Sequence, residues 1–420
     1  MIGVEVGVDD WSALKATTMT STTSNYLVAE AQLLAEQARR EKAKLLKDAG
    51  EPIELPGKAL SIEVQGNDVW IAENDHVVKK LNLESGKASQ IYRGHTGPVT
   101  SIAFYNHDGK QFLISGSWDK SIRVWDTQTK EPLATTTDAH NDFVKTLLVI
   151  PTLRLLVSGG SDKIVRFWDL SSPTQPLRGS GSISSHTRPI ECLAGYATSA
   201  TSAVIYTADT MGIIRIWEVK REEGSGSEPP LWRSTQRGEL TNHRTRINDL
   251  FVGQGLVWTA SSDDTAQLSP IVPVGSDVPS SNVKLPKPIE HPTAVRAILP
   301  LALTDLSEPY LLTASGDVIR VYDLSTLDEP ELISSTDIHW HDVTAIRLWK
   351  RKTVKDGLTH VEPWIVTTSL DQTVRKWRLT ELLNPPPPKK PEVAEESNTV
   401  NDSGLTEEEE RELAELLDED

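Results

Sequence analysis

Cysteine is almost absent from this sequence: Cys192 is the only one in 420 residues. A single thiol forms neither an intrachain disulfide nor a cysteine-based metal site, so we expect a reducing compartment, cytoplasmic or nuclear. No apolar run reaches the roughly 18 residues of a membrane span, and residues 1–15 lack the apolar core of a secretory signal. We therefore expect no membrane partner. We interpret Cys192 as a small buried hydrophobe, with a reactive thiol as the alternative.

Positive charge is also in short supply. The chain has 43 lysines and arginines against 60 aspartates and glutamates, which gives a formal net charge of −17. A surface of this sign repels phosphate backbones and anionic lipid headgroups. Direct binding to nucleic acid is therefore not expected, although a local basic patch remains possible.

The motifs of common catalytic and nucleotide-binding sites are missing. The sequence contains no GxxxxGK[ST], HExxH, GxSxG or CxxC pattern. We predict that the protein is not an enzyme and that it has no cofactor and no metal site.

Phenylalanine is scarce, with five residues, whereas tryptophan is abundant, with twelve. The tryptophans belong to an internal repeat. Six segments, 45 to 57 residues apart, each begin with a histidine followed four and seven residues later by aliphatic residues. These histidines are His95, His140, His186, His243, His291 and His339.

Each of these segments later reaches a short strand that ends near an aromatic residue, except that Ser269 takes this place in the fifth repeat. Two of the strands end in Trp-Asp, at Trp125-Asp126 and Trp168-Asp169, and Gly94-His95 opens one segment. In these features residues 56–380 resemble the WD40 repeat family. An earlier segment, residues 58–93, keeps the pattern but lacks the histidine.

The resemblance implies an all-β fold, a seven-bladed WD40 β-propeller. Each sequence repeat in this family straddles two blades, so the last blade lacks its outer strand. We predict that residues 51–55 supply this strand and close the ring, which removes free sheet edges. The expected organisation is an N-terminal extension with a helix (1–50), the propeller (51–383), and a proline-rich linker with a disordered acidic tail that carries a short helix (384–420).

The resemblance also implies a buried chain of hydrogen bonds in each blade, through the histidine, a serine or threonine, a turn aspartate and the strand tryptophan. His95, Asp119 and Trp125 would form one such chain, and His140, Asp162 and Trp168 another. The fourth and sixth repeats lack the usual turn aspartate. Catalytic histidine–aspartate pairs are disfavoured, because the pairs recur from blade to blade and catalysis needs only one.

An arginine recurs two residues before the strand aromatic. We expect these arginines to pack on the faces of the strands, and a basic stripe for nucleic acid is the alternative. The members are Arg123, Arg166, Arg215, Arg320 and Arg375.

One face of the propeller, the top face, is expected to carry the loops around the repeat histidines and the turn aspartates. Tryptophan and arginine are enriched in binding hot spots, and Trp118 stands at a position that is usually small in the family. Local packing of these loop aromatics is the alternative. The predicted partner-binding residues are Trp118, Phe143, Arg188, Arg244, Arg246 and Trp340, with Ser161 and Leu370 beside them.

Two insertions, residues 220–229 and 270–284, are expected on the opposite, bottom face. A basic cluster of Lys350, Arg351, Lys352 and Lys355 is expected there too, as a solvated hairpin, with contact to phosphate or a nuclear-import factor as the alternative.

Both ends of the chain predict helices. Residues 24–48 carry an imperfect apolar stripe, formed by Leu27, Leu34, Ala38, Leu45 and Leu46, which would dock on the propeller or on a partner helix. Near the C-terminus, Thr406 and Glu409 form a capping-box pattern ahead of Leu413, Leu416 and Leu417. This acidic segment is interpreted as a motif that folds on a partner, or as a solubilising tail.

The function predicted from these features is a non-catalytic scaffold or adaptor that binds other proteins in a larger complex. One alternative is a substrate receptor of a ubiquitin ligase, but the Trp-Asp-x-Arg box of such receptors is absent, since Thr127-Gln128 follows Trp125-Asp126. The other alternative is a subunit of an RNA- or chromatin-associated complex.

Overall fold

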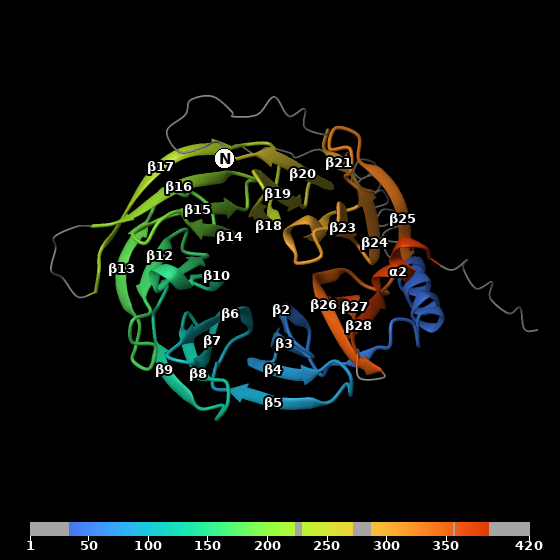
Figure 1. Cartoon of the computed structure of the whole chain (residues 1–420), viewed down its shortest axis with the longest axis horizontal. Helices are drawn as coiled ribbons and strands as arrows, with labels where there is room; N and C mark the ends of the chain where they lie inside the picture. The colour runs from blue at the N-terminus through green and yellow to red at the C-terminus, as the bar shows by residue number, and fades with distance from the viewer. Residues whose placement is uncertain (1–32, 223–228, 272–286, 356–357, 386–420) are drawn as a thin grey trace, which may run out of the picture. The chain divides into compact units, whose positions relative to one another are not determined.

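Seven four-stranded antiparallel sheets form a ring in the structure, a computed structural model that describes residues 33–222, 229–271, 287–355 and 358–385 (Figure 1). The predicted seven-bladed propeller is confirmed. In six blades the strands follow one another in sequence order from the inner strand to the outer strand.

The first blade contains β2 (Ala59–Gln65), β3 (Asp68–Glu73), β4 (Val77–Asn82) and β5 (Ala88–Arg93), and the second contains β6 (Val99–His107), β7 (Lys110–Ser117), β8 (Ile122–Asp126) and β9 (Pro132–Thr136). The third contains β10 (Val144–Ile150), β11 (Leu155–Gly160), β12 (Val165–Asp169) and β13 (Arg178–Ile183), and the fourth contains β14 (Ile190–Ala197), β15 (Ser202–Asp209), β16 (Ile214–Arg221) and β17 (Trp232–Leu240). The fifth contains β18 (Ile247–Gly253), β19 (Leu256–Ser261), β20 (Thr265–Pro270) and β21 (Ile289–Glu290), and the sixth contains β22 (Val295–Pro300), β23 (Tyr310–Ser315), β24 (Val318–Asp323) and β25 (Glu331–Asp337). Short helical turns η1 (Pro151–Leu153), η2 (Leu301–Leu303) and α2 (Leu379–Leu383) accompany the strands.

The seventh blade joins the two ends of the propeller. It contains β26 (Val343–Lys355), β27 (Leu358–Ser369), β28 (Thr373–Arg378) and, as its outer strand, β1 (Ile53–Glu54). Ile53 pairs with Val374, and the Leu55 amide donates a hydrogen bond to the Gln372 carbonyl at 2.8 Å. The predicted closure by residues 51–55 is confirmed.

The apolar core lies between successive blades. On β8, Ile122 and Val124 are buried while Arg123 between them is half-buried, which is the period-two pattern of a packed strand. The next residue, Trp125, meets Tyr92 of the first blade edge-to-face, with ring centroids 5.8 Å apart. Each sheet therefore needs its neighbour to bury its aromatic residues, and an open ring would leave one such surface bare.

The N-terminal helix docks on the propeller through polar contacts. Residues 33–45 are helical, and the predicted residues 24–32 lie outside the described part of the chain. Lys42 Nζ donates to Asp317 at 2.6 Å and to Asp337 at 2.5 Å. The predicted apolar stripe does not face the propeller, since Leu34 is 61% and Leu45 is 67% exposed. The predicted docking of this helix on the propeller is confirmed, but paired charges rather than the apolar stripe hold it there.

Several predicted features fall on residues that the structure does not describe. They are most of the two insertions, within 223–228 and 272–286, and the tail segment with Leu413, Leu416 and Leu417. Among the described helices, none is both long and apolar enough to span a membrane.

Candidate functional site

The predicted buried hydrogen-bond chain is present in the second blade. His95 Nδ1 lies 2.8 Å from Asp119 Oδ2, and His95 Nε2 lies 2.8 Å from Ser115 Oγ. The indole Nε1–H of Trp125 donates to the same Ser115 Oγ at 2.8 Å. Neutral His95 with its proton on Nδ1 satisfies all these contacts, because Nδ1–H then donates to the carboxylate and Nε2 accepts from the serine hydroxyl. The third blade repeats the chain through His140, Asp162, Ser158 and Trp168.

The fourth blade lacks the usual turn aspartate, as predicted, but its histidine still has an aspartate partner. Its usual turn position holds Met211, but Asp209 at the end of β15 accepts from His186 Nδ1 at 3.0 Å. The fourth network is therefore complete, because an aspartate two residues earlier reaches the same nitrogen. The sixth blade does lack the aspartate, and His291 Nδ1 donates to the carbonyl of Ile289 at 3.0 Å instead.

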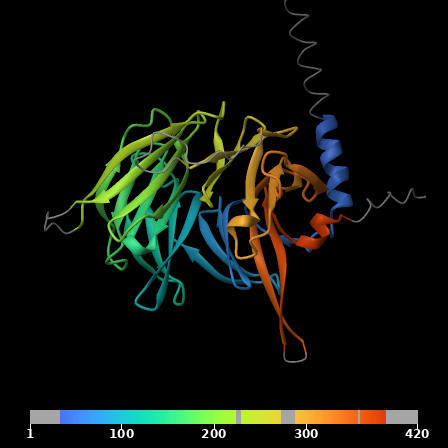
Figure 2. The ribbon, with the colours of Figure 1, turned by 45° about the horizontal axis from the view of Figure 1, so that its top comes forward.

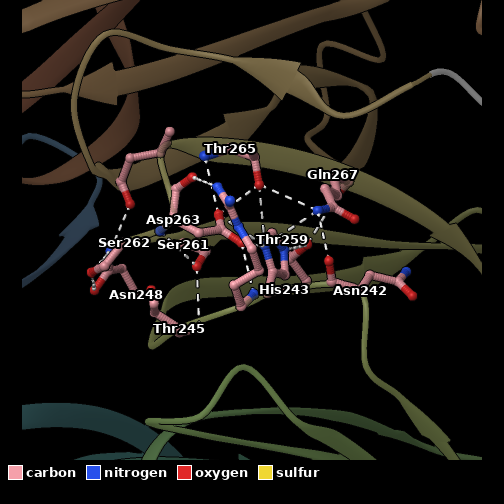
Figure 3. Close-up of polar contacts among 12 residues, drawn as sticks. Asn242, His243, Thr245, Asn248, Thr259, Ser261, Ser262, Asp263, Thr265 and Gln267 are labelled. Carbon is pink, nitrogen blue, oxygen red and sulfur yellow. Dashed lines mark hydrogen bonds and ion pairs between the residues drawn. The ribbon is translucent and has the colours of Figure 1, made fainter.

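The fifth blade lacks the tryptophan, as predicted. His243 still bridges Asp263 and Thr259, and Thr265 and Gln267 extend the network (Figure 3). Ser269 takes the tryptophan position and accepts a hydrogen bond from Asn242 Nδ2 at 2.7 Å. A short polar pair thus replaces the indole.

Burial favours the neutral form of four network histidines, His95, His243, His291 and His339. Burial lowers the pKa of His95, His243 and His339, although hydrogen bonds to their aspartates act in the opposite direction. His291, which has no aspartate, has its pKa lowered by burial to about 4. In the aspartates, burial raises the pKa, but hydrogen bonds from the histidines and from backbone amides outweigh it and hold the pKa of Asp162 at about 2.

Serine, histidine and aspartate in a hydrogen-bonded row also describe a nucleophilic triad, but this arrangement does not suit catalysis. Ser115 is fully buried and its oxygen already accepts from the Trp125 indole. A nucleophile must reach substrate with a free lone pair. The same arrangement recurs around the ring, so its role is to stabilise each blade.

The sharpest feature of the top face is a stacked pair of aromatic rings. Trp118 follows β7 in the second blade, and Phe143 precedes β10 in the third. Their ring centroids lie 4.7 Å apart with an interplanar angle of 12°. Trp118 nevertheless remains 40% exposed. The sequence predicted both residues for this face, but not their contact across two blades.

The predicted arginines are spread around this face. Arg188 and Arg244 are exposed, and the Arg244 guanidinium donates to the Asp263 carbonyl at 3.3 Å. Arg246 pairs with Glu191 at 2.9 Å. Trp340 is half-buried beside His341 in the seventh blade, with centroids 6.3 Å apart, and no described contact joins it to Trp118.

A central cavity of about 670 Å³ opens beside Trp118 and is lined by the inner strands of all seven blades. Its charged residues are largely paired: Glu191 lies 3.6 Å from Lys145 as well as contacting Arg246, and Arg347 pairs with Glu63 at 3.3 Å. Asp249 also lines the cavity, and its carboxylate accepts hydrogen bonds from the Leu250 and Ile298 amides, with no ion-pair partner among the described residues.

Cys192, predicted to be a small buried hydrophobe, packs against the apolar cluster that contains Ile247 and Leu250, but it lines this cavity and is only half-buried. The cause is its place on the innermost strand, β14, whose side chains reach the channel. Burial raises the pKa of its thiol, which disfavours the reactive thiolate. Among the described residues, no group of three or more histidine, cysteine, aspartate or glutamate side chains could hold a metal ion.

The strand arginines are used within the fold. Arg166 pairs with Asp162 at 3.3 Å, Arg215 with Glu239 at 3.0 Å, and buried Arg375 donates to the carbonyls of Leu46 and Ala49. They do not form a solvent-facing basic stripe for nucleic acid.

Comparison with known proteins agrees with the blade networks. The model of the WD40 family (WD domain, G-beta repeat) matches residues 86–126 and 130–169. These two segments are WD40 repeats. It is 29% identical over 373 residues to an uncharacterised WD repeat-containing protein of Schizosaccharomyces pombe, a match that covers 86% of this chain and 90% of that protein.

Other relatives match only locally. The mRNA export factor GLE2 of Chaetomium thermophilum is 33% identical over 82 residues, 20% of this chain and 23% of that protein. The THO complex subunit 6 homolog of Danio rerio is 26% identical over 82 residues, 19% of this chain and 25% of that protein. The crystal structure of the computationally designed protein Ika8 shares the fold, with a TM-score of 0.52 and 21% identity over 76% of this chain and 83% of that one.

Proposed function

We propose that this WD40 propeller is a non-catalytic scaffold or adaptor that holds segments of other proteins on its top face. The observation that carries the proposal is the exposed Trp118–Phe143 stack. Stacking fixes the indole before a partner arrives, so little side-chain entropy is lost on binding. A rigid, half-exposed tryptophan has the character of an interface hot spot.

The test compares partners recovered by affinity purification of the full chain with those of the Trp118→Ala variant. We expect loss of at least one partner, with a cost on the order of 2 kcal/mol in binding for a hot-spot tryptophan. The matched control is Leu332→Ala, which removes an exposed apolar side chain from outer strand β25. If both variants retain every partner at the wild-type level, the top face is not the contact.

The C-terminal motif needs its own variant, a chain without residues 403–420. We propose that Leu413, Leu416 and Leu417 form a second, separate contact, so this deletion should remove a different partner from the one that depends on Trp118. A deletion that changes no partner identifies the segment as a solubilising tail.

A subunit of an RNA-associated complex is the second candidate. It is favoured by the names of the relatives, an mRNA export factor and a THO complex subunit homolog. With a net charge of −17, the chain would join such a complex through protein contacts, in the nucleus or the cytoplasm. Association that survives RNase treatment but is lost in Trp118→Ala supports this candidate. We also expect that the purified chain alone does not retain RNA at low salt.

A further inference from the structure

The hairpin of β26 and β27 in the seventh blade is longer than any other inner hairpin. β26 has 13 residues, whereas the inner strands of the other blades have 6 to 9. β28 pairs with β27 only as far as Trp364. Residues 350–355 and 358–363 therefore form a two-stranded ribbon, which projects from the ring (Figure 2).

The base of this ribbon is clamped by both neighbouring blades. The Arg351 guanidinium lies 5.8 Å from the ring centroid of Trp349 and 5.1 Å from that of Trp364. It also donates two hydrogen bonds, of 2.9 and 2.8 Å, to Glu84 of the first blade. On the other side, Lys350 pairs with Asp305 of the sixth blade. The clamp sets the direction of the ribbon before anything binds.

The outer part of the ribbon exposes apolar side chains. Val354 is 73%, Leu358 66% and Val361 51% exposed. Val354 lies opposite Thr359 and Val361 opposite Lys352, so both valines share one face with Lys352. Two-stranded ribbons are weak on their own, and exposed apolar edges invite another strand. The ring is already closed by β1, so closure does not require this extension.

We propose that the ribbon is a docking arm for an extended, acidic segment of another protein, which adds a strand along it. Charge decides the occupant. β26 carries Lys350, Arg351 and Lys352 in a row, and exposed Lys352 has no ion-pair partner among the described residues. A second copy of the ribbon would bring like charges together, which destabilises paired strands. A partner strand that carries both acidic and apolar side chains on the face it shares with Lys352, Val354 and Val361 satisfies the lysine and the valines.

The test measures binding of labelled synthetic peptides to the full chain by fluorescence anisotropy. One peptide repeats Val-Thr-Glu-Thr over about ten residues, so that valine and glutamate share one face, and the other repeats Val-Thr-Lys-Thr. We expect the glutamate peptide to bind at least about tenfold more tightly than the lysine peptide. N-methylation of alternate backbone amides on one edge of the glutamate peptide should abolish binding, because strand addition uses backbone hydrogen bonds.

The double variant Val354→Thr and Val361→Thr keeps β-branched residues but removes apolar surface. It should bind the glutamate peptide about fivefold or more weakly than the wild type does. Leu332→Thr is the matched control on β25 and should bind like wild type. Equal binding of the two peptides, or equal binding by the double variant, overturns the proposal. Wild-type dimers that dissociate in the double variant also overturn it, because they identify a second copy as the occupant. The double variant leaves Trp118 intact, so this outcome is independent of the top-face proposal.

Discussion

Ser115 occupies the centre of the best-formed blade network. Its oxygen accepts from the Trp125 indole while its hydroxyl donates to His95 Nε2. Two side chains thus depend on one small polar atom, and the cost of losing it exceeds that of one hydrogen bond.

We expect Ser115→Ala to lower the free energy of unfolding by about 2–4 kcal/mol, because the indole N–H and the imidazole nitrogen both lose their buried partner. Urea unfolding followed by tryptophan fluorescence measures this loss. Ser182→Ala, at an exposed position on β13, is the control and should change stability by less than about 0.5 kcal/mol. Equal stability of the two variants contradicts the role of Ser115.

The limits of sequence-based prediction are clear at this scale. His95, Asp119 and Trp125 could be assigned because a repeat places them at fixed spacings. Asp209 was missed because it reaches His186 from outside the usual turn position. The Trp118–Phe143 stack was missed because spacing along the chain does not say which loops of neighbouring blades meet.

At the scale of the elements, β1 has only two residues, yet it closes the ring. It covers the edge of β28, and Leu55 beside it is buried with Val374 and Trp364 in one cluster. The sequence predicted it because a repeat that straddles two blades leaves one strand missing.

Removal of β1 is expected to open the ring. The free energy of unfolding of a chain that begins at Pro56 should be about 2–4 kcal/mol lower than that of a chain that begins at Glu51. The shorter chain lacks the buried leucine, Leu55, and the strand pairing. It should also associate through the free edge of β28. Differential scanning calorimetry and size-exclusion chromatography measure both effects. Both chains lack the N-terminal helix, so identical melting and elution would rule out the closing role of β1.

The residues that hold the N-terminal helix on the propeller could not be predicted from the apolar pattern. The sixth blade has no aspartate in its histidine network, and its turn residue Asp317 instead accepts from Lys42. A residue that departs from the repeat pattern has thus acquired a contact outside the repeat. Hydrophobic spacing carries no information about an ion pair between segments 275 residues apart.

For the molecule as a whole, the buried networks predict sensitivity to acid. Burial lowers the pKa of four network histidines in the folded state, so below pH 6.5 the unfolded chain binds protons that the folded chain does not. Stability is full above that pH and declines toward pH 4, the approximate pKa of His291. The loss then continues below pH 3.8, because Asp162 and Asp263 have folded pKa values of about 2.

We expect the melting temperature to be flat from pH 8 to 7 and to fall steadily below pH 6.5. The free energy of unfolding should fall with it, by up to about 1.4 kcal/mol per pH unit for each histidine. Calorimetry across this range measures the slope. His360→Asn, which changes an exposed histidine of the ribbon, should leave the slope unchanged. A melting temperature that is constant or rising from pH 7 to 5 contradicts this assignment.

The pairing of β1 with β28 also orders events during synthesis. Ile53 and Val374 are neighbours in one sheet, yet more than three hundred residues separate them along the chain. At about 5–20 residues per second, the ribosome makes Val374 roughly 16 to 64 seconds after Ile53. Throughout that interval β1 has no partner, and the blades already made form an open arc. The last strand to leave the ribosome completes the fold, so a truncated translation product cannot close.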